Sequence, residues 1–144
     1  MLKICRKTYD DFISTVSQLP IESGGIIGAV DDVVCAYYID KINYNEDTYK
    51  PDADLLNDKI QQWQKLDVEF YGIFHTHPDC VKELSVPDKQ SIEILMNQLT
   101  DRSKSLYFPL VFQDKTMVAF EAEFVDDNIV IKKTKIVIIN KGFS

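Results

Sequence analysis

Residues 68–88, VEFYGIFHTHPDCVKELSVPD, join a β-branched and aromatic segment to the two histidines of the chain. The segment Val68–Phe74 predicts a strand, because β-branched and aromatic residues favour extended structure. His75 and His77 follow it directly. Residues two apart on a strand project to the same face of a sheet, so both imidazoles can converge on one metal ion.

A third candidate ligand is Asp88, eleven residues after His77. A carboxylate at the start of the following helix would complete a two-His, one-Asp site, and three protein ligands leave one zinc position open for water. Zinc lowers the pKa of that water to about 7 and polarises a substrate carbonyl. Glu22, in the segment Ile21–Gly25, is the candidate base. Asp79 is an alternative carboxylate ligand.

Each of these residues also has a simpler explanation. Two histidines at the end of a strand are often half-exposed side chains that bind nothing. Ser85-x-x-Asp88 before an apolar segment is a helix-capping box, and Glu22 alone is a solvated acid beside a glycine turn. Capping and metal binding are compatible, because a helix start holds side chains rigidly. The residues indicate a site only in combination.

In combination they resemble the JAMM signature of the JAB/MPN metalloproteases. That signature is an upstream Glu, then His-x-His, seven residues, Ser, two residues and Asp. The chain matches it without a gap, at Glu22 beside the segment Gly24–Val30, His75, His77, Ser85 and Asp88. Only six residues separate Pro78 from Ser85, and this compactness resembles the prokaryotic, bacterial branch of the family.

The resemblance implies a role for each residue. His75, His77 and Asp88 would bind one zinc ion per chain, with water in the fourth position. Glu22 would hold this water and act as general base, and Ser85 would hydrogen-bond the oxyanion. The implied reaction is deubiquitinase-like hydrolysis of a peptide or isopeptide bond after the Gly-Gly tail of a ubiquitin-like or sulfur-carrier protein. An activating or conjugating enzyme would be an associated partner.

Two other functions stay open. One is a processing protease that trims a sulfur-carrier or ubiquitin-like precursor. The other is a non-catalytic, zinc-bearing module that binds a partner. An intact Glu22 argues against the module, since structural zinc sites are closed and need no base.

Composition and charge limit the number of domains, the kinds of partner and the location of the protein. The chain has 144 residues, with 16 Lys plus Arg against 23 Asp plus Glu and a net charge of -7, which predicts one domain over residues 1–144. This acidity argues against nucleic acid as a partner. No secretory signal is visible, and the longest apolar segment, Val33–Ile39, is too short to span a membrane. The three cysteines form no Cys-x-x-Cys unit, so we expect a cytoplasmic protein.

The periodicity predicts an α+β fold, and the resemblance implies the MPN version, a curved and mostly antiparallel sheet flanked by helices. Thr8 is the expected cap of the first helix, and Pro109 favours an edge position or a bulge for its strand. The apolar face of the second helix would comprise Leu55, Leu56, Lys59, Ile60, Trp63 and Leu66. We predict helices over 9–19, 55–66 and 87–99, and strands over 24–30, 33–42, 68–74, 106–113, 116–124 and 129–139.

Two weaker hypotheses concern substrate and regulation. The segment Asn43–Asp58 carries Glu46, Asp47, Asp52, Asp54 and Asp58 against Lys50. It could bind an Arg- or Lys-bearing substrate tail, partly by strand addition, or be an ordinary solvated loop. Cys80, three residues after His77, could make the site sensitive to oxidation.

Overall fold

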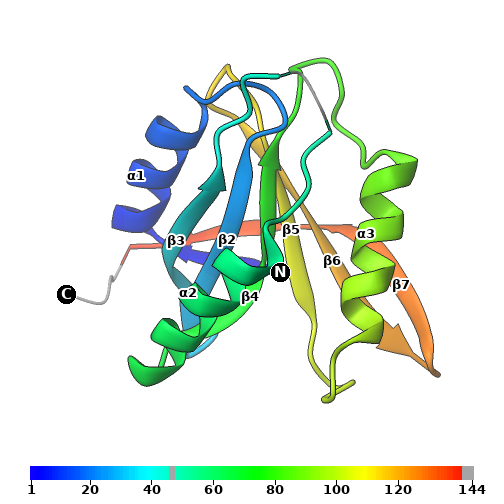
Figure 1. Ribbon diagram of the computed structural model, residues 1–144. Coiled ribbons are helices and arrows are strands. Elements are labelled where there is room, and N and C mark those ends of the chain that lie inside the picture. Colours follow the sequence, from blue (N-terminus) through cyan, green and yellow to red (C-terminus); the bar gives the residue numbers. More distant parts are fainter. Residues whose placement is uncertain (46–47, 141–144) are drawn as a thin grey trace.

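A computed structural model of the chain describes residues 1–45 and 48–140. The described residues form eight strands and three helices (Figure 1). The helices are α1 (Arg6–Val16), α2 (Ala53–Lys65) and α3 (Val86–Asn97). The strands are β1 (Leu2–Cys5), β2 (Gly24–Val30), β3 (Val33–Lys41), β4 (Glu69–Thr76), β5 (Leu106–Val111), β6 (Met117–Val125), β7 (Asn128–Thr134) and β8 (Ile136–Ile139).

All eight strands belong to one mixed sheet, in the order β7-β6-β5-β4-β2-β3-β1-β8. Antiparallel ladders join β2 to β3, β2 to β4, β5 to β6 and β6 to β7. Parallel ladders join β1 to β3, β1 to β8 and β4 to β5. The predicted α+β class is confirmed, and antiparallel pairing predominates by one ladder.

The two edge strands of this sheet are consecutive in the sequence. β7 ends at Thr134 and β8 begins at Ile136, yet they lie at opposite ends of the strand order. The sheet therefore curves until a single chain segment, coloured orange to red in Figure 1, supplies both edges. The backbone N–H of Leu2 donates to the carbonyl of Lys135 at 2.7 Å, where this segment passes β1.

Helices cover both faces of the sheet. Neighbouring residues of β2 point to opposite faces: Ile27 packs with Phe12 of α1 in one core cluster, and Ile26 packs with Trp63 of α2 in another. α3 covers β5 and β6 on the face that α2 also covers, where Ile92 lies in a third cluster. Phe74 belongs to the α1 cluster, and His75 and His77 alternate with it along the strand, so both point to the opposite face, which α2 and α3 cover.

Three local predictions are wrong for reasons of tertiary structure. The first helix begins at Arg6, directly after β1, so Thr8 lies inside it and the N-cap is Cys5, without a side-chain capping bond. Leu66 follows α2 and is 72% exposed, so it is not part of the buried face. Leu55, at 36% exposed, is also not buried, whereas Leu56 and Trp63 are.

The late strands also differ from the prediction. The segment 129–139 is two strands rather than one, because the chain passes from pairing with β6 to pairing with β1 at Lys135. β5 is an internal strand between β4 and β6, so the edge position predicted from Pro109 is wrong. Its ladder with β4 pairs Tyr107 and Leu110 but skips Pro109, which tolerates the missing N–H.

None of the helices in the described part of the chain has the length and apolar character that a membrane span requires.

Candidate metal centre

Strand β4 brings the two histidines together. It extends through Thr76, two residues beyond the predicted strand, and His75 pairs with Gly24 of β2. The backbone N–H of His77 donates to the carbonyl of Val111 in β5 at 3.1 Å. Both histidines are buried, at 7% and 3% exposed, and their Nε2 atoms lie 2.9 Å apart.

Glu22 reaches the histidines because backbone pairing continues past the start of β2. Its N–H donates to the carbonyl of Thr76 at 3.0 Å, and the Thr76 N–H donates to the carbonyl of Ser23 at 2.8 Å. Glu22 has a φ of 66°, a left-handed conformation that is uncommon for residues other than glycine. Its carboxylate lies 3.9 Å from Nε2 of His75 and 3.9 Å from Nε2 of His77.

Asp88 enters the site from the first turn of α3. Its Oδ1 lies 3.4 Å from Nε2 of His75, and its Oδ2 lies 3.3 Å from Nε2 of His77. The predicted capping box is confirmed: the Ser85 N–H donates to Oδ2 of Asp88 at 2.9 Å, and the Asp88 N–H donates to Oγ of Ser85 at 3.1 Å. The helix cap thus fixes the carboxylate that faces both imidazoles.

Hydrogen bonding defines which nitrogen of His77 is free. Its Nδ1 lies 3.1 Å from the carbonyl of Val81, and a carbonyl only accepts, so Nδ1 carries the proton. In the neutral ring, Nε2 therefore presents a lone pair, as a metal ligand must. Burial alone would lower the pKa of His77, but hydrogen bonds to Asp88 and to Val81 raise it above the ordinary value.

The ionisation of Asp88 follows from the same contacts. Burial alone would raise its pKa, but hydrogen bonds from His75 and His77 hold the pKa of this carboxyl far below its usual range. Asp88 is therefore an anion under all ordinary conditions, which suits a metal ligand.

Glu22, His75, His77 and Asp88, hereafter the four-residue cluster, have the composition of a metal site. The ligand atoms of Glu22 and the two histidines all lie within 4.8 Å of one another, and the Asp88 oxygens are nearer still to the imidazoles. Within residues 1–45 and 48–140, no Lys or Arg forms an ion pair with either carboxylate. Two imidazoles and two carboxylates without a cationic partner fit a divalent ion such as zinc.

The other predicted site residues fall near the cluster or outside it. Ser85 accepts the capping bond through Oγ, so its hydroxyl proton remains available to a second acceptor. Asp79 accepts the backbone N–H of Gln113 at 2.9 Å, and this contact directs it to the β5–β6 turn. Cys80 is a free, exposed cysteine, and its predicted sensitivity to oxidation stays a prediction.

Tyr49 is a site residue that sequence reasoning missed. Its ring stacks on the His75 imidazole, with centroids 5.7 Å apart and an interplanar angle of 9°. Its N–H donates to Oε2 of Glu22 at 3.2 Å, and its hydroxyl donates to Oδ1 of Asp40 at 2.8 Å. Burial raises the pKa of Tyr49 and that of Asp40. The only signal in the sequence was an aromatic residue within a polar segment.

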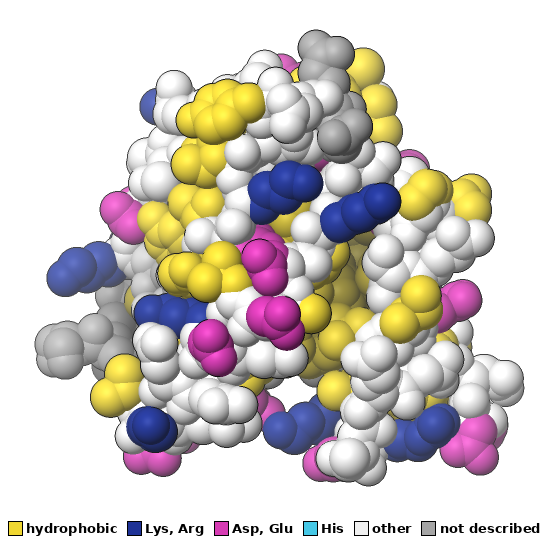
Figure 2. Space-filling model, in the orientation of Figure 1, with side chains coloured by type: hydrophobic (Ala, Val, Ile, Leu, Met, Phe, Trp, Pro, Cys, Tyr) yellow, Lys and Arg dark blue, Asp and Glu magenta, His cyan; other side chains and the backbone are white. Residues whose placement is uncertain are grey.

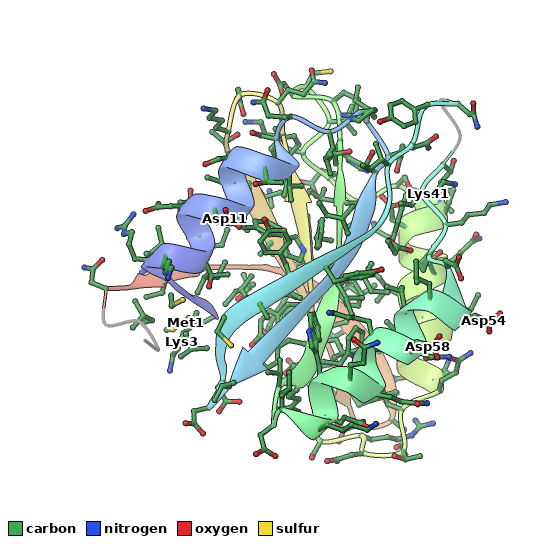
Figure 3. All side chains as sticks on the ribbon, turned by 60° about the vertical axis from the view of Figure 1, so that its left-hand side comes forward. Met1, Lys3, Asp11, Lys41, Asp54 and Asp58 are labelled. Atoms are coloured by element: carbon green, nitrogen blue, oxygen red, sulfur yellow. The ribbon has the colours of Figure 1, made fainter. Side chains whose placement is uncertain are left out.

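The acidic residues of the segment Asn43–Asp58 have different positions in the structure. Asp52 caps α2 by accepting the N–H of Leu55 at 3.2 Å, so one of its roles is structural. Asp54 and Asp58 are exposed on α2 (Figure 3). Glu46 and Asp47 lie outside the described residues. The proposed contact between this segment and a substrate tail stays a prediction.

An apolar cleft of about 340 Å³ leads to the cluster, with His75 and Asp88 among the residues that line it. Figure 2 shows the hollow between α2 and α3, with hydrophobic side chains on its floor. No Lys or Arg of the described chain lines it. The aliphatic and aromatic lining includes Ile26, Ile73, Leu56, Ile60, Ile92 and Phe108.

The chain matches no protein-family model and no curated protein. Its fold does match solved structures. A protein of Desulfitobacterium hafniense, known from a solution structure, superposes with a TM-score of 0.67 at 17% identity, covering 98% of this chain and 94% of that chain. A protein of Salinibacter ruber gives a TM-score of 0.56 at 16% identity, with coverages of 95% and 91%.

A third similar structure carries a descriptive name. It is a JAB1/MPN domain protein of Archaeoglobus fulgidus, with a TM-score of 0.53 at 12% identity and coverages of 96% and 97%. At this identity the likeness concerns the fold alone. The chain therefore has an MPN-like fold, as its resemblance to the JAB/MPN family implied, with a candidate metal site in it.

Proposed function

We propose that this chain, whose fold is MPN-like, is a zinc-dependent peptidase or isopeptidase that cleaves the bond after the C-terminal tail of a ubiquitin-like protein. The observation that carries the proposal is the convergence of two imidazoles and two carboxylates at the cleft. The order and spacing of the JAMM-like residues also support it. Three free cysteines are in keeping with a reducing, cytoplasmic location.

The structure favours Asp88 over Glu22 as the third ligand. Both Asp88 oxygens lie within 3.4 Å of an imidazole Nε2, and the side chain is 8% exposed. The Glu22 oxygens lie 3.9 Å away, and this side chain is 21% exposed. We therefore assign zinc to His75, His77 and Asp88. Zinc held there would polarise the scissile carbonyl and lower the pKa of a water molecule beside it.

Glu22 then remains as the general base. Its carboxylate takes a proton from the attacking water, the water oxygen bonds to the scissile carbonyl carbon, and the carbon–nitrogen bond breaks. Glu22 returns the proton to the leaving amine, so it ends the cycle ionised, as it began. Partial exposure suits this role, because the carboxylate must reach water and substrate as well as the cluster.

In this proposal Ser85 stabilises charge on the reacting carbonyl. Its hydroxyl oxygen is already fixed by the Asp88 N–H, so the hydroxyl proton can point to a developing oxyanion. A donor that is oriented before the reaction contributes more than one that must reorient during it.

The cleft supports an extended peptide substrate. Away from His75 and Asp88 at the cluster, its lining is mostly aliphatic and aromatic, and the polar residues there, Asn57, Ser91 and Gln98, carry no charge. A large uncharged side chain of the tail would gain from burial there, whereas a charged one would lose hydration without a partner. Basic residues of the tail would instead face Asp54 and Asp58, outside the cleft.

The first experiment is metal content, measured on protein purified without a metal-affinity tag. We expect about one zinc per wild-type chain and none in His77→Ala. Absence of zinc in the wild type after reconstitution would contradict the proposal and favour a partner-binding module.

The second experiment is a substrate panel that holds the Gly-Gly tail constant. It compares a ubiquitin-like protein in isopeptide linkage to lysine, the same protein with a peptide-linked extension, and a short tail peptide. Cleavage of the isopeptide supports the proposed activity. Cleavage of the extension alone would identify a processing protease for a ubiquitin-like or sulfur-carrier precursor, and cleavage of none by zinc-loaded protein would contradict catalysis.

A further inference from the structure

Tyr49 joins the segment between β3 and α2 to the candidate metal centre. Its neighbours Thr48 and Lys50 are exposed, yet Tyr49 is only 8% exposed. It belongs to none of the three core clusters found among the described residues. Its burial comes instead from the site, where the ring lies flat against the His75 imidazole at a centroid distance of 5.7 Å.

The backbone of Tyr49 contacts the candidate base. Its N–H donates to Oε2 of Glu22 at 3.2 Å, while Oε1 of Glu22 faces Nε2 of His77 at 3.9 Å. A carboxylate can rotate about its terminal bond. The hydrogen bond to one oxygen therefore limits the directions in which the other can point.

The hydroxyl of Tyr49 fixes Tyr49 itself. It donates to Oδ1 of Asp40, at 2.8 Å, and Oδ2 of Asp40 accepts the N–H of Asp52 at 2.9 Å. Asp52 is the N-cap of α2. One carboxylate on β3 thus connects Tyr49 to the start of a helix, so the ring is held at both of its ends.

Strand β2 leaves room for the ring. A Cβ atom placed on Gly24 would lie 2.7 Å from ring atoms of Tyr49, too close for real contact. Gly24 is the register partner of His75. The absence of a side chain at Gly24 thus allows the Tyr49 ring to pack over β2 and β4 at the position of His75.

We propose that Tyr49 is a positioning residue of the candidate metal centre. Its ring holds the imidazole of His75, its backbone N–H holds the carboxylate of Glu22, and its bond to Asp40 keeps both contacts in place. A ligand and the base are then oriented by a single residue. The catalytic part of this inference rests on the proposed function, whereas the metal-binding part does not.

The test compares Tyr49→Phe with Tyr44→Phe. Tyr44 is 79% exposed in the same segment and serves as the matched control. Tyr49→Phe keeps the ring and loses only the bond to Asp40. We expect zinc affinity, measured by chelator competition, to fall about tenfold, as for other groups that orient a metal ligand. We expect kcat to fall by a similar factor at unchanged KM, and Tyr44→Phe to match the wild type in both.

A second variant tests the proposed route through Asp40. Asp40→Ala should reproduce the losses of Tyr49→Phe, and the double variant should be no worse than the more affected single variant, because the same bond is missing in each. Asp40→Asn, which retains an acceptor, should restore most of the zinc affinity. Additive losses would overturn the route.

The outcomes separate this inference from the proposed function. Wild-type protein that binds zinc but cleaves no substrate contradicts the proposed function, and Tyr49 is then judged by zinc affinity alone. Equal zinc affinity in Tyr49→Phe and wild type, or a lower melting temperature as its only defect, overturns the positioning role. A wild type that binds no zinc overturns both.

Discussion

The imidazole of His77 and the carboxylate of Asp88 meet at 3.3 Å, between Nε2 and Oδ2. The same oxygen accepts the backbone N–H of Ser85 at 2.9 Å. One carboxylate thus serves the start of α3 and the histidine pair at the end of β4. The helix cap and the approach of Asp88 to both imidazoles therefore occur together, as the compatibility of capping with metal binding requires.

Asp88→Asn should separate those two roles. An amide still accepts the capping bond but is a poor zinc ligand, so we expect zinc affinity to fall by more than about 100-fold. The melting temperature of the metal-free protein should change little. Asp79→Asn is the matched control, because Asp79 contacts the backbone of Gln113 instead. Retained zinc affinity in Asp88→Asn would mean that Glu22 completes the site.

Glu22→Gln should keep zinc and lose turnover. The amide oxygen still accepts the Tyr49 N–H, but the group can no longer take a proton, so kcat should fall by at least about 100-fold. Zinc per chain is measured in the same preparations. Glu83→Gln, whose side chain is 75% exposed and paired with Lys133, should be fully active. A near-normal kcat in Glu22→Gln would contradict the proposed role of Glu22 as general base.

Ser85 allows stability and catalysis to be separated. Glycine is a good N-cap, so Ser85→Gly should cost only a few tenths of a kcal/mol, whereas Ser85→Ala should cost about 1 kcal/mol of unfolding free energy. Both lack the hydroxyl donor, and in both kcat should fall by about 100-fold or more. Ser85→Thr should restore both properties. Denaturant unfolding and steady-state kinetics give the two readouts, and full activity of Ser85→Gly would exclude an oxyanion role.

The metal-free protein should show a characteristic dependence of stability on pH. The raised pKa of His77 gives a stabilisation that is lost as pH rises through its folded value, and the lowered pKa of Asp88 gives one that is lost as pH falls through its folded value. Stability from this pair is therefore greatest between the ordinary pKa of an aspartate and that of a histidine.

Zinc should reverse the alkaline side of this dependence. Above the pKa of His77 the ring is free to bind metal, so zinc-loaded protein should gain stability with rising pH where chelator-treated protein loses it. Melting temperatures with zinc and with chelator, from mildly acidic to mildly alkaline pH, make the comparison. His77→Gln should abolish the difference, and parallel curves for the wild type would contradict the site.

Ile94 offers a test of the cleft. It lines the cleft and is 62% exposed, so Ile94→Glu should fold normally. A charge there would oppose an apolar tail, and we expect KM to rise about fivefold or more with zinc content unchanged. Val125→Glu, at another exposed apolar position on β6, is the control. An unchanged KM would show that the tail binds elsewhere.

The sequence predicts where the helices and strands lie better than it predicts which strands pair with one another. Strand β2 has the predicted bounds, and the histidine pair shares one face because strand periodicity is a local property. Strand β1 was missed because its four residues gain stability only from distant strands. The edge position predicted from Pro109 is wrong for the same reason. β5 is internal although Pro109 cannot donate a backbone hydrogen bond, and the sequence pattern alone does not identify the strands that flank it.

The same holds for the site: contacts between residues close in sequence could be predicted, and contacts that depend on tertiary structure could not. The spacing of Ser85 and Asp88 specifies a capping box, and the structure contains it. That Glu22 stands opposite His77 depends on the pairing of β2 with β4. The place of Tyr49 in the site could not be predicted from the sequence, because its burial depends on Asp40 and on the absence of a side chain at Gly24.

The consecutive edge strands also impose an order on biosynthesis. Leu2 pairs with Ile136, so β1 leaves the ribosome before the other strands of the sheet but receives β8 only after all of them have been made. Such distant pairing is slow to form. The four-residue cluster lies between Glu22 and Asp88, and its strands β2 and β4 are translated much earlier. The nascent chain thus acquires the residues that would hold a metal well before β8, the edge strand that completes its sheet.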